Sequence, residues 1–300
     1  MALQVEIWVK SIVEGLFANN TFAARSVDHS EWVDSKTVHV PNAGAAPNVE
    51  KNRTEFPAKV TQREDVDLTY QMDEFTVDPV RIPHAETVEL AYSKRESVIR
   101  QSRHKLAQDV HDSLIYDWIP EGVKVIETTG EAVAAHIAGA KGNRKKMTRA
   151  IVEELQTLFD EQEIPEEGRC ILLDARMYNQ LLNSMTDAER NSFLVCADPA
   201  RGVIGKYMGF DFYKRSKVAK AAEDGTVKPW NAAAETTDCA AGLAWQEDCV
   251  SRALGESVLF DDEGNPLYYS DIISFLQRAG GSSIRSDKKG IILIKQGTAA

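Results

Sequence analysis

This chain of 300 residues has few cysteines, no long apolar run and no internal repeat. Its four cysteines are widely spaced and form no CxxC pair, which favours free thiols over a disulfide framework or a zinc site. They are Cys170, Cys196, Cys239 and Cys249. No apolar stretch approaches the ~18 residues of a membrane span. Charged Glu6 and Lys10 interrupt the first apolar stretch, which also lacks a basic leader and so does not resemble a signal peptide. We therefore expect no membrane contact and a reducing compartment.

Catalytic motifs are also missing. His104 and His111 are seven residues apart on a predicted helix, ~10 Å along its axis, which is too far for one metal ion. The "HAE" of residues 84–86 is not followed by the PCxxC of a zinc deaminase, and the "GVIGK" of 202–206 lacks the P-loop spacing. A basic segment at 139–146 could receive an anion at a helix start, but a solvated loop explains it as well. We predict no catalytic residue, no cofactor and no metal.

The charge of the chain is negative, with a formal net value of −11. This balance excludes a nucleic-acid binder held by a general positive field, although an acidic chain can still have local basic patches. The hydrophobic fraction of 43% and the charged fraction of 27% are those of a folded globular protein. A chain of this length can bury a sizeable core in one large domain or two medium ones.

Helical periodicity is strongest over residues 86–118. Leu106, Val110, Leu114 and Trp118 recur every four residues, and basic residues occupy the polar side. Such a helix would be ~45 Å long, which is unusual in a compact domain. A shorter amphipathic helix is predicted over residues 3–17.

Residues 122–237 alternate between helix and strand signals. The pattern predicts a helix with a basic start at 142–164, a buried strand at 168–174, a helix at 175–184 and a hairpin at 202–216. The tail is predicted to begin with a strand at 239–245 and a short helix before residue 264. It then returns to strands, with "SDKKG" as a turn. The fold class is therefore α+β.

An extended segment at 36–65 cannot build a core of its own. It has three prolines, nine charged residues and only five large apolar residues. Folded as a hairpin at ~3.3 Å per residue it would reach ~45–50 Å, whereas a compact body of this length has a radius of gyration of ~19 Å. An isolated hairpin is marginal in water. We therefore expect the segment to rest on a neighbouring copy, in a head-to-tail contact that can close rings.

In the order of its parts the chain resembles the major capsid (coat) proteins of tailed double-stranded DNA bacteriophages, which have the Hong Kong 97-type fold. "WVKSIVEGLFANNTFAARSVD" is similar to their N-terminal segment, and "KTVHVPNAGAAPNVEKNRTEFPAKVTQRED" to their extended loop. "ELAYSKRESVIRQSRHKLAQDVHDSLIYDW" resembles the spine helix. "GRCILLDARMYNQLL" and "GVIGKYMGFDFYKRS" resemble the axial domain, and "AGLAWQEDCVSRALG" with "DKKGIILIKQG" the closing peripheral segment. The resemblance covers nearly the whole chain.

The resemblance implies four parts. Residues 1–35 would form the N-terminal arm and 36–75 the extended loop, a β-hairpin. Residues 76–121 and 238–300 would form the peripheral β domain with the spine helix, and 122–237 the axial α/β domain.

It also implies a function without catalysis. The chain would self-assemble, as pentamers and hexamers, into the icosahedral shell that encloses the phage DNA without sequence specificity. A separate scaffold, a portal and decoration proteins would be further partners. The location would be the virion capsid, assembled in the host cell cytoplasm. The predicted inter-subunit contacts lie in the loop: Lys51, Arg53, Glu55, Phe56, Lys59 and Arg63.

Other functions remain open at this point. An encapsulin-like nanocompartment shell shares the fold but encloses protein cargo. A tail-tube protein would form helical tubes instead of closed particles. An enzyme with a nonlocal active site in residues 122–237 is the alternative from a different class.

Overall fold

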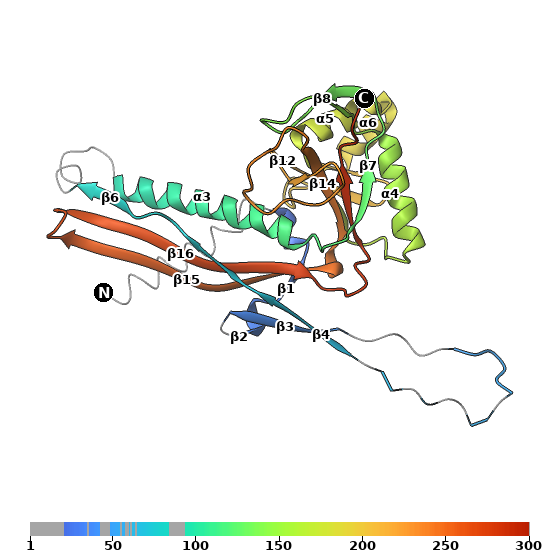
Figure 1. Cartoon of the computed structure of the whole chain (residues 1–300), viewed down its shortest axis with the longest axis horizontal. Coiled ribbons are helices and arrows are strands. Elements are labelled where there is room, and N and C mark those ends of the chain that lie inside the picture. Colours follow the sequence, from blue (N-terminus) through green and yellow to red (C-terminus); the bar gives the residue numbers. More distant parts are fainter. Residues whose placement is uncertain are drawn as a thin grey trace.

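The computed structural model describes residues 21–34, 36–42, 49–54, 56–57, 60, 62–63, 65–83 and 94–299. The helix predicted at 3–17 lies outside them. Figure 1 shows a compact body with helices on its flanks, and a long arm in which a helix runs beside a two-stranded ribbon. A further pair of strands leads away from the body in another direction.

The body is built on a seven-stranded sheet with the order β11-β12-β10-β14-β17-β7, and with β13 paired to β14. Its strands are β7 (Lys124–Glu127), β10 (Arg169–Asp174), β11 (Gly205–Tyr207), β12 (Phe210–Arg215), β13 (Ala219–Ala221), β14 (Cys239–Gln246) and β17 (Ile291–Lys295). Every residue of β10 is buried, as the apolar run predicts. Helices α4 (Arg149–Glu161), α5 (Ala175–Ser184) and α6 (Asp187–Val195) belong to the same body.

Alternation along β10 divides the core of the body between the two faces of the sheet. Ile171 packs with the apolar residues of α4 and α5, among them Leu155 and Phe159. Leu172 belongs instead to a cluster that contains Trp118 and Phe22. Successive side chains of a strand point to opposite faces, so one strand serves both layers. The predicted helix at 175–184 and the hairpin of β11 with β12 are confirmed.

The arm consists of helix α3 (Lys94–Asp117) on a five-stranded sheet with the order β1-β15-β16-β5, and with β6 paired to β16. The strands are β1 (Val27–Asp28), β5 (Asp73–Thr76), β6 (Val80–Pro83), β15 (Val250–Asn265) and β16 (Ser270–Ser283). The predicted apolar face of α3 is confirmed, since Leu106 and Val110 pack with Ile273 and Phe275 of β16.

A three-stranded sheet, β2-β3-β4, forms the base of the extended segment. Its strands are β2 (Val33–Asp34), β3 (Thr37–Asn42) and β4 (Val66–Gln71), and β3 and β4 pair from Thr37↔Gln71 to Asn42↔Val66. Val38 and Val40 are buried there with Met72. The smaller elements are the 3-10 turns Thr21–Ala24, Ser30–Trp32 and Glu247–Cys249, and the hairpin of β8 (Ala132–Ala134) with β9 (Asn143–Lys145).

Two local predictions are wrong. The basic start of the predicted helix at 142–164 is strand β9, and α4 begins only at Arg149, because residues 143–145 pair with β8. The short helix predicted before residue 264 is a three-residue 3-10 turn followed by the sixteen-residue strand β15. Residues 250–265 are extended because they pair with β16, and a short stretch of sequence does not contain both paired strands.

The tail also divides between the two sheets. The "SDKKG" segment leads from β16 in the arm to β17 in the body and does not join two strands of one hairpin. β14 and β17, both after residue 237, pair with β10 and β7 of the body. The expected boundary between 122–237 and 238–300 is therefore crossed by the hydrogen bonds of one sheet.

Candidate assembly surfaces

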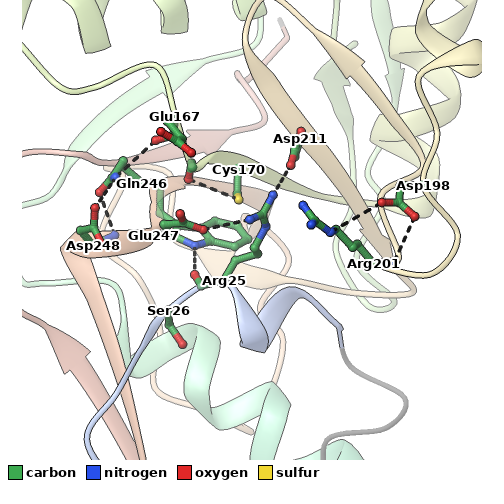
Figure 2. A network of polar contacts seen from close by, with 12 residues as sticks. Arg25, Ser26, Glu167, Cys170, Asp198, Arg201, Asp211, Gln246, Glu247 and Asp248 are labelled. Atoms are coloured by element: carbon green, nitrogen blue, oxygen red, sulfur yellow. Dashed lines mark hydrogen bonds and ion pairs between the residues drawn. The ribbon is translucent and has the colours of Figure 1, made fainter.

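The segment 21–34 is fastened to the body by Arg25 (Figure 2). Its guanidinium donates hydrogen bonds to the hydroxyl of Tyr213, at 3.2 Å, and to Glu247, at 3.0 Å, and forms an ion pair with Asp211. Its backbone carbonyl accepts a hydrogen bond of 2.8 Å from Trp245 Nε1. Burial raises the pKa of Tyr213 to about 12, so its hydroxyl stays neutral beside the arginine. Two strands of the body, β12 and β14, and the 3-10 turn at Glu247 thus converge on one residue.

A second arginine fixes the same segment to the arm. Arg252 of β15 donates to the carbonyls of Ala23 and Ser26, at 2.8 and 2.9 Å, and pairs with Asp28 at 3.0 Å. Phe22 inserts its ring edge-on against Trp118, with 5.8 Å between the ring centroids. The segment therefore connects body and arm in one subunit, as part of its core.

The loop residues predicted to contact a neighbour have only local partners among those described. Lys51 and Phe56 are exposed, Phe56 to 78%. Arg53 pairs with Glu50 at 3.2 Å, three residues away, and Arg63 pairs with Asp65 at 2.6 Å. Glu55 and Lys59 lie outside the described residues. Within the described part of the loop no hydrogen bond or ion pair joins two of the six candidates.

Trp32, Trp230 and Phe260 are exposed singly, and the other large exposed apolar side chains gather at three places. They are Val49, Phe56 and Val60 of the loop, Leu267, Tyr268 and Tyr269 in the turn between β15 and β16, and Leu194 and Val195 at the end of α6. Leu267 is 83% exposed and Tyr269 81%. Sequence reasoning missed the hairpin turn, although three consecutive large apolar residues after Pro266 are the signal that could have found it. Contiguous exposed apolar side chains of this kind mark interaction surfaces.

The polar groups of residues 122–237 act as structural links. His136 Nδ1 lies 3.1 Å from Asp174 Oδ2, and Gln180 lies 2.9 Å from His136 Nε2. Gln180 in turn accepts a hydrogen bond from the backbone N–H of Met147, and Asp174 accepts one from that of Met177. Both ring nitrogens are therefore engaged within the fold, and the pair offers no base to a nucleophile.

The cysteines do not form a reactive site either. Burial raises the pKa of the Cys170 thiol far above its usual range, and raises that of Cys249 to about 11. Cys239 is buried and only Cys196 is exposed. In the described part of the chain no group of three His, Cys, Asp or Glu side chains could hold a metal ion. None of the helices described there has the length and hydropathy to cross a membrane.

A cavity of about 520 Å³ lies between α3 and the body. Its walls come from Lys105, Gln108 and Asp112 of α3 and from Lys217 and Trp230 of the body's loops, among others. Trp230 packs edge-on against Phe75 of β5, with 5.8 Å between the centroids. Acidic and basic side chains line the cavity together with apolar ones such as Ile137 and Val218.

The fold matches solved structures of viral shells, while neither a family model nor a curated protein sequence matches the chain. The capsid of the cyanophage P-SCSP1u has a TM-score of 0.61 at 17% identity, over 92% of this chain and 87% of that one. The capsid of Ralstonia phage GP4 has 0.61 at 13% identity, over 92% and 88%. A virus-like particle from Pyrococcus furiosus has 0.56 at 9% identity, over 97% and 99%. This chain has the fold of these shells, and the predicted Hong Kong 97-type α+β class is confirmed.

Proposed function

We propose that this chain is the major capsid protein of a tailed double-stranded DNA phage and that it self-assembles into a closed icosahedral shell. The observation that carries the proposal is the fold shared with phage capsids over more than nine-tenths of the chain. Exposed apolar side chains at the loop, the hairpin turn and the end of α6 support it. A shell subunit needs large interfaces, which in obligate assemblies often exceed ~2,000 Å².

The loop is the proposed contact with a neighbouring subunit. Phe56 would be its apolar anchor, and the charges of Lys51, Arg53, Glu55, Lys59 and Arg63 would select the register through complementary pairing. The proposed parts are an N-terminal arm of residues 1–35, an extended loop of residues 36–75, a peripheral domain of residues 76–121 with 238–300, and an axial domain of residues 122–237. Because β10 and β14 pair in one sheet, backbone hydrogen bonds join the proposed axial and peripheral domains.

The proposed shell also implies contents, partners and a location. Pentamers and hexamers of this chain would enclose the DNA, with a separate scaffold, a portal and decoration proteins as further partners. The site of action would be the virion capsid after assembly in the host cytoplasm. The role is structural and needs no catalysis.

An encapsulin-like shell remains the second candidate, because the virus-like particle from Pyrococcus furiosus also shares the fold. Electron microscopy of the purified protein, combined with nuclease digestion of particles recovered from infected cells, separates the two. We expect closed particles that protect DNA. Closed particles that contain only protein would favour the second candidate, and a monomeric compact protein would overturn both.

The loop itself can be tested without disturbing its base. Because Asn42 and Val66 face each other in the β3–β4 pair, residues 43–65 can be replaced by the two-residue turn Asn-Gly. We expect a soluble, folded subunit that no longer forms shells. Phe56→Ala is the finer version, with Thr54→Ala, an exposed polar residue of the same loop, as its control. Normal particles from the shortened chain would contradict the role of the loop.

A further inference from the structure

The charge of helix α3 is opposite to that of the chain as a whole. Between residues 95 and 108 it has four cationic side chains, Arg95, Arg100, Arg103 and Lys105, and a single carboxylate, Glu96. The whole chain has a net charge of −11. Over all 24 residues α3 has five cations and four carboxylates, so the positive excess is confined to this first part, ~20 Å of the helix axis.

The basic side of α3 faces solvent. Arg100 and Lys105 are exposed, together with Gln101 and Gln108. The opposite side of the helix is buried against β16. Arg95 is neutralised at one end of the helix, where it pairs with Asp261 and Glu263 of β15. Arg100 and Lys105 therefore form the exposed basic side of the helix.

The stripe continues from the helix onto the body. Lys217, in the loop after β12, is exposed and lines the same cavity as Lys105 and Gln108. Two carboxylates of that cavity already have partners, since Asp109 pairs with Lys105 at 2.7 Å and Asp112 with Arg215 at 2.5 Å. Asp174, on another wall, is held by His136.

Two cations of the stripe lack a carboxylate partner within the described residues. No described carboxylate lies within ion-pair distance of Arg100 or of Lys217, and Asp112, a neighbour of Lys217, is already paired with Arg215. We define the basic stripe as the exposed cations Arg100, Lys105 and Lys217. Its long side chains can reach an anion outside the subunit.

We propose that the basic stripe binds the phosphate backbone of the enclosed double-stranded DNA, so that the solvent side of α3 faces the interior of the shell. The inference rests on the proposed function and names the surface that meets the DNA. Lysine, arginine and glutamine side chains contact phosphates without reading bases. A stripe of three cations in each acidic subunit, repeated over a shell, would hold DNA at many weak, sequence-independent points and leave it free to slide during packing.

A second protein copy fits this surface less well. Interfaces between proteins are centred on apolar or aromatic anchors. None of the large exposed apolar residues described for the chain lies on α3. The basic stripe has no apolar centre, so it suits a polyanion better than it suits a protein partner.

The experiment measures binding of the full chain, as unassembled subunits, to a fluorescein-labelled 30-base-pair duplex by anisotropy at 20–200 mM KCl. The variant is Arg100→Gln/Lys105→Gln/Lys217→Gln. Because each phosphate contact contributes about one unit to the slope of log K against log salt, we expect the slope to lose about three units and the affinity at low salt to fall at least tenfold. An unchanged slope would overturn the inference.

The matched control removes three exposed cations elsewhere: Lys141→Gln/Arg176→Gln/Lys289→Gln. It makes the same change in net charge, so we expect binding close to that of the parent chain. An equal loss in the control would show that net charge decides binding and would overturn the inference. Thermal unfolding within a few degrees of the parent chain verifies that both variants are folded.

Electron microscopy separates the inference from the proposed function. We expect the stripe variant to form closed particles that hold DNA less tightly. A variant that binds the duplex like the parent chain but forms no particles would identify the stripe as a protein interface and overturn the inference. Absence of particles from the parent chain would overturn the proposed function and this inference together, whereas particles with an unchanged salt slope would overturn the inference alone.

Discussion

Trp245 donates a hydrogen bond from its indole Nε1 to the backbone carbonyl of Arg25, 2.8 Å away, although the two residues are 220 positions apart in the chain. Trp245 lies on β14 at the centre of the body's sheet and is completely buried. Arg25 extends its side chain past it to Asp211 and Glu247 (Figure 2). The N-terminal segment is thus a structural part of the subunit body.

Removing the charge of Arg25 should destabilise the subunit. Arg25→Met leaves the carboxylate of Asp211, whose side chain is 8% exposed, with Lys206 at 2.8 Å as its remaining cation. Loss of one partner from a buried pair costs about 3–5 kcal/mol, and Lys206 should reduce this to about 2–3 kcal/mol of unfolding free energy in urea. Arg201→Met is the control, because its pair with Asp198 is exposed, at 3.7 Å, and should contribute less than about 1 kcal/mol. Equal losses would contradict the role of Arg25.

The buried face of α3 should not tolerate a charge. Val110 is 4% exposed and packs in the cluster with Phe275, so Val110→Asp buries an unpaired carboxylate. We expect a loss of more than about 3 kcal/mol or an insoluble chain. Gln108→Asp, two residues away on the exposed side, places the same group in water and should change the midpoint of thermal unfolding by only a few degrees. Unaltered unfolding of the Val110 variant would show that the buried face is misassigned.

The close approach of α3 to β16 should depend on Gly281. A Cβ at this position would lie 2.4 Å from Leu114 Cδ1 and 2.7 Å from the backbone oxygen of Ser251. Because the second contact is with backbone, Gly281→Ala should cost about 1–3 kcal/mol in urea unfolding. At Gly255 of the paired strand the nearest atom is the mobile methyl of Met72, at 2.8 Å, so Gly255→Ala should cost less. The reverse order of the two losses would contradict this packing.

The joint between α3 and the arm sheet should respond to pH through Asp117. Burial, and then the neighbouring carboxylate of Asp73, raise the pKa of Asp117 to about 7. The folded chain therefore binds this proton more tightly than the unfolded chain, whose aspartates have pKa values near 3.9. The contribution of this group to stability is complete below about pH 4 and is lost as the pH rises to about 7.

Asp117→Asn should remove this dependence. The difference in unfolding free energy between the variant and the parent chain should shift in favour of the variant by roughly 2–4 kcal/mol from pH 4 to pH 8, because one pKa unit is 1.36 kcal/mol. Urea unfolding across pH 4–8 measures it. Burial lowers the pKa of His111 to about 4, which gives a trend of opposite sign, but this trend is present in both chains and cancels in the comparison. Parallel profiles for parent and variant would contradict the prediction.

Local sequence patterns predict those helices and strands whose apolar residues recur at a regular spacing. The spacing of Leu106, Val110 and Leu114 predicts the buried face of α3, and the apolar run before Asp174 predicts β10, which is buried throughout. The Gly205 to Arg215 hairpin follows from its glycines and strand residues. Each of these depends on residues within a few positions of one another, so sequence spacing contains the necessary information.

The rest needed partners that are distant in sequence. The sequence predicts a short helix within the segment that forms strand β15, whose conformation is instead determined by pairing with β16 across a long ribbon. The exposed turn at Leu267 and Tyr269 stands out only when the hairpin is seen to end there. The six loop candidates rest on residue type alone, and the contacts proposed for them would be made with another copy of the chain.

Composition and order alone thus established a chain of the α+β class with a long helix, an extended segment unable to bury itself and no catalytic motif, because these properties are local. Tertiary structure decided which strands share a sheet across residue 237, how Arg25 and Arg252 bind the N-terminal segment between body and arm, and where the basic stripe continues onto Lys217. The residues that these contacts join are as many as 229 positions apart in the sequence, and only the folded chain brings them within hydrogen-bonding distance.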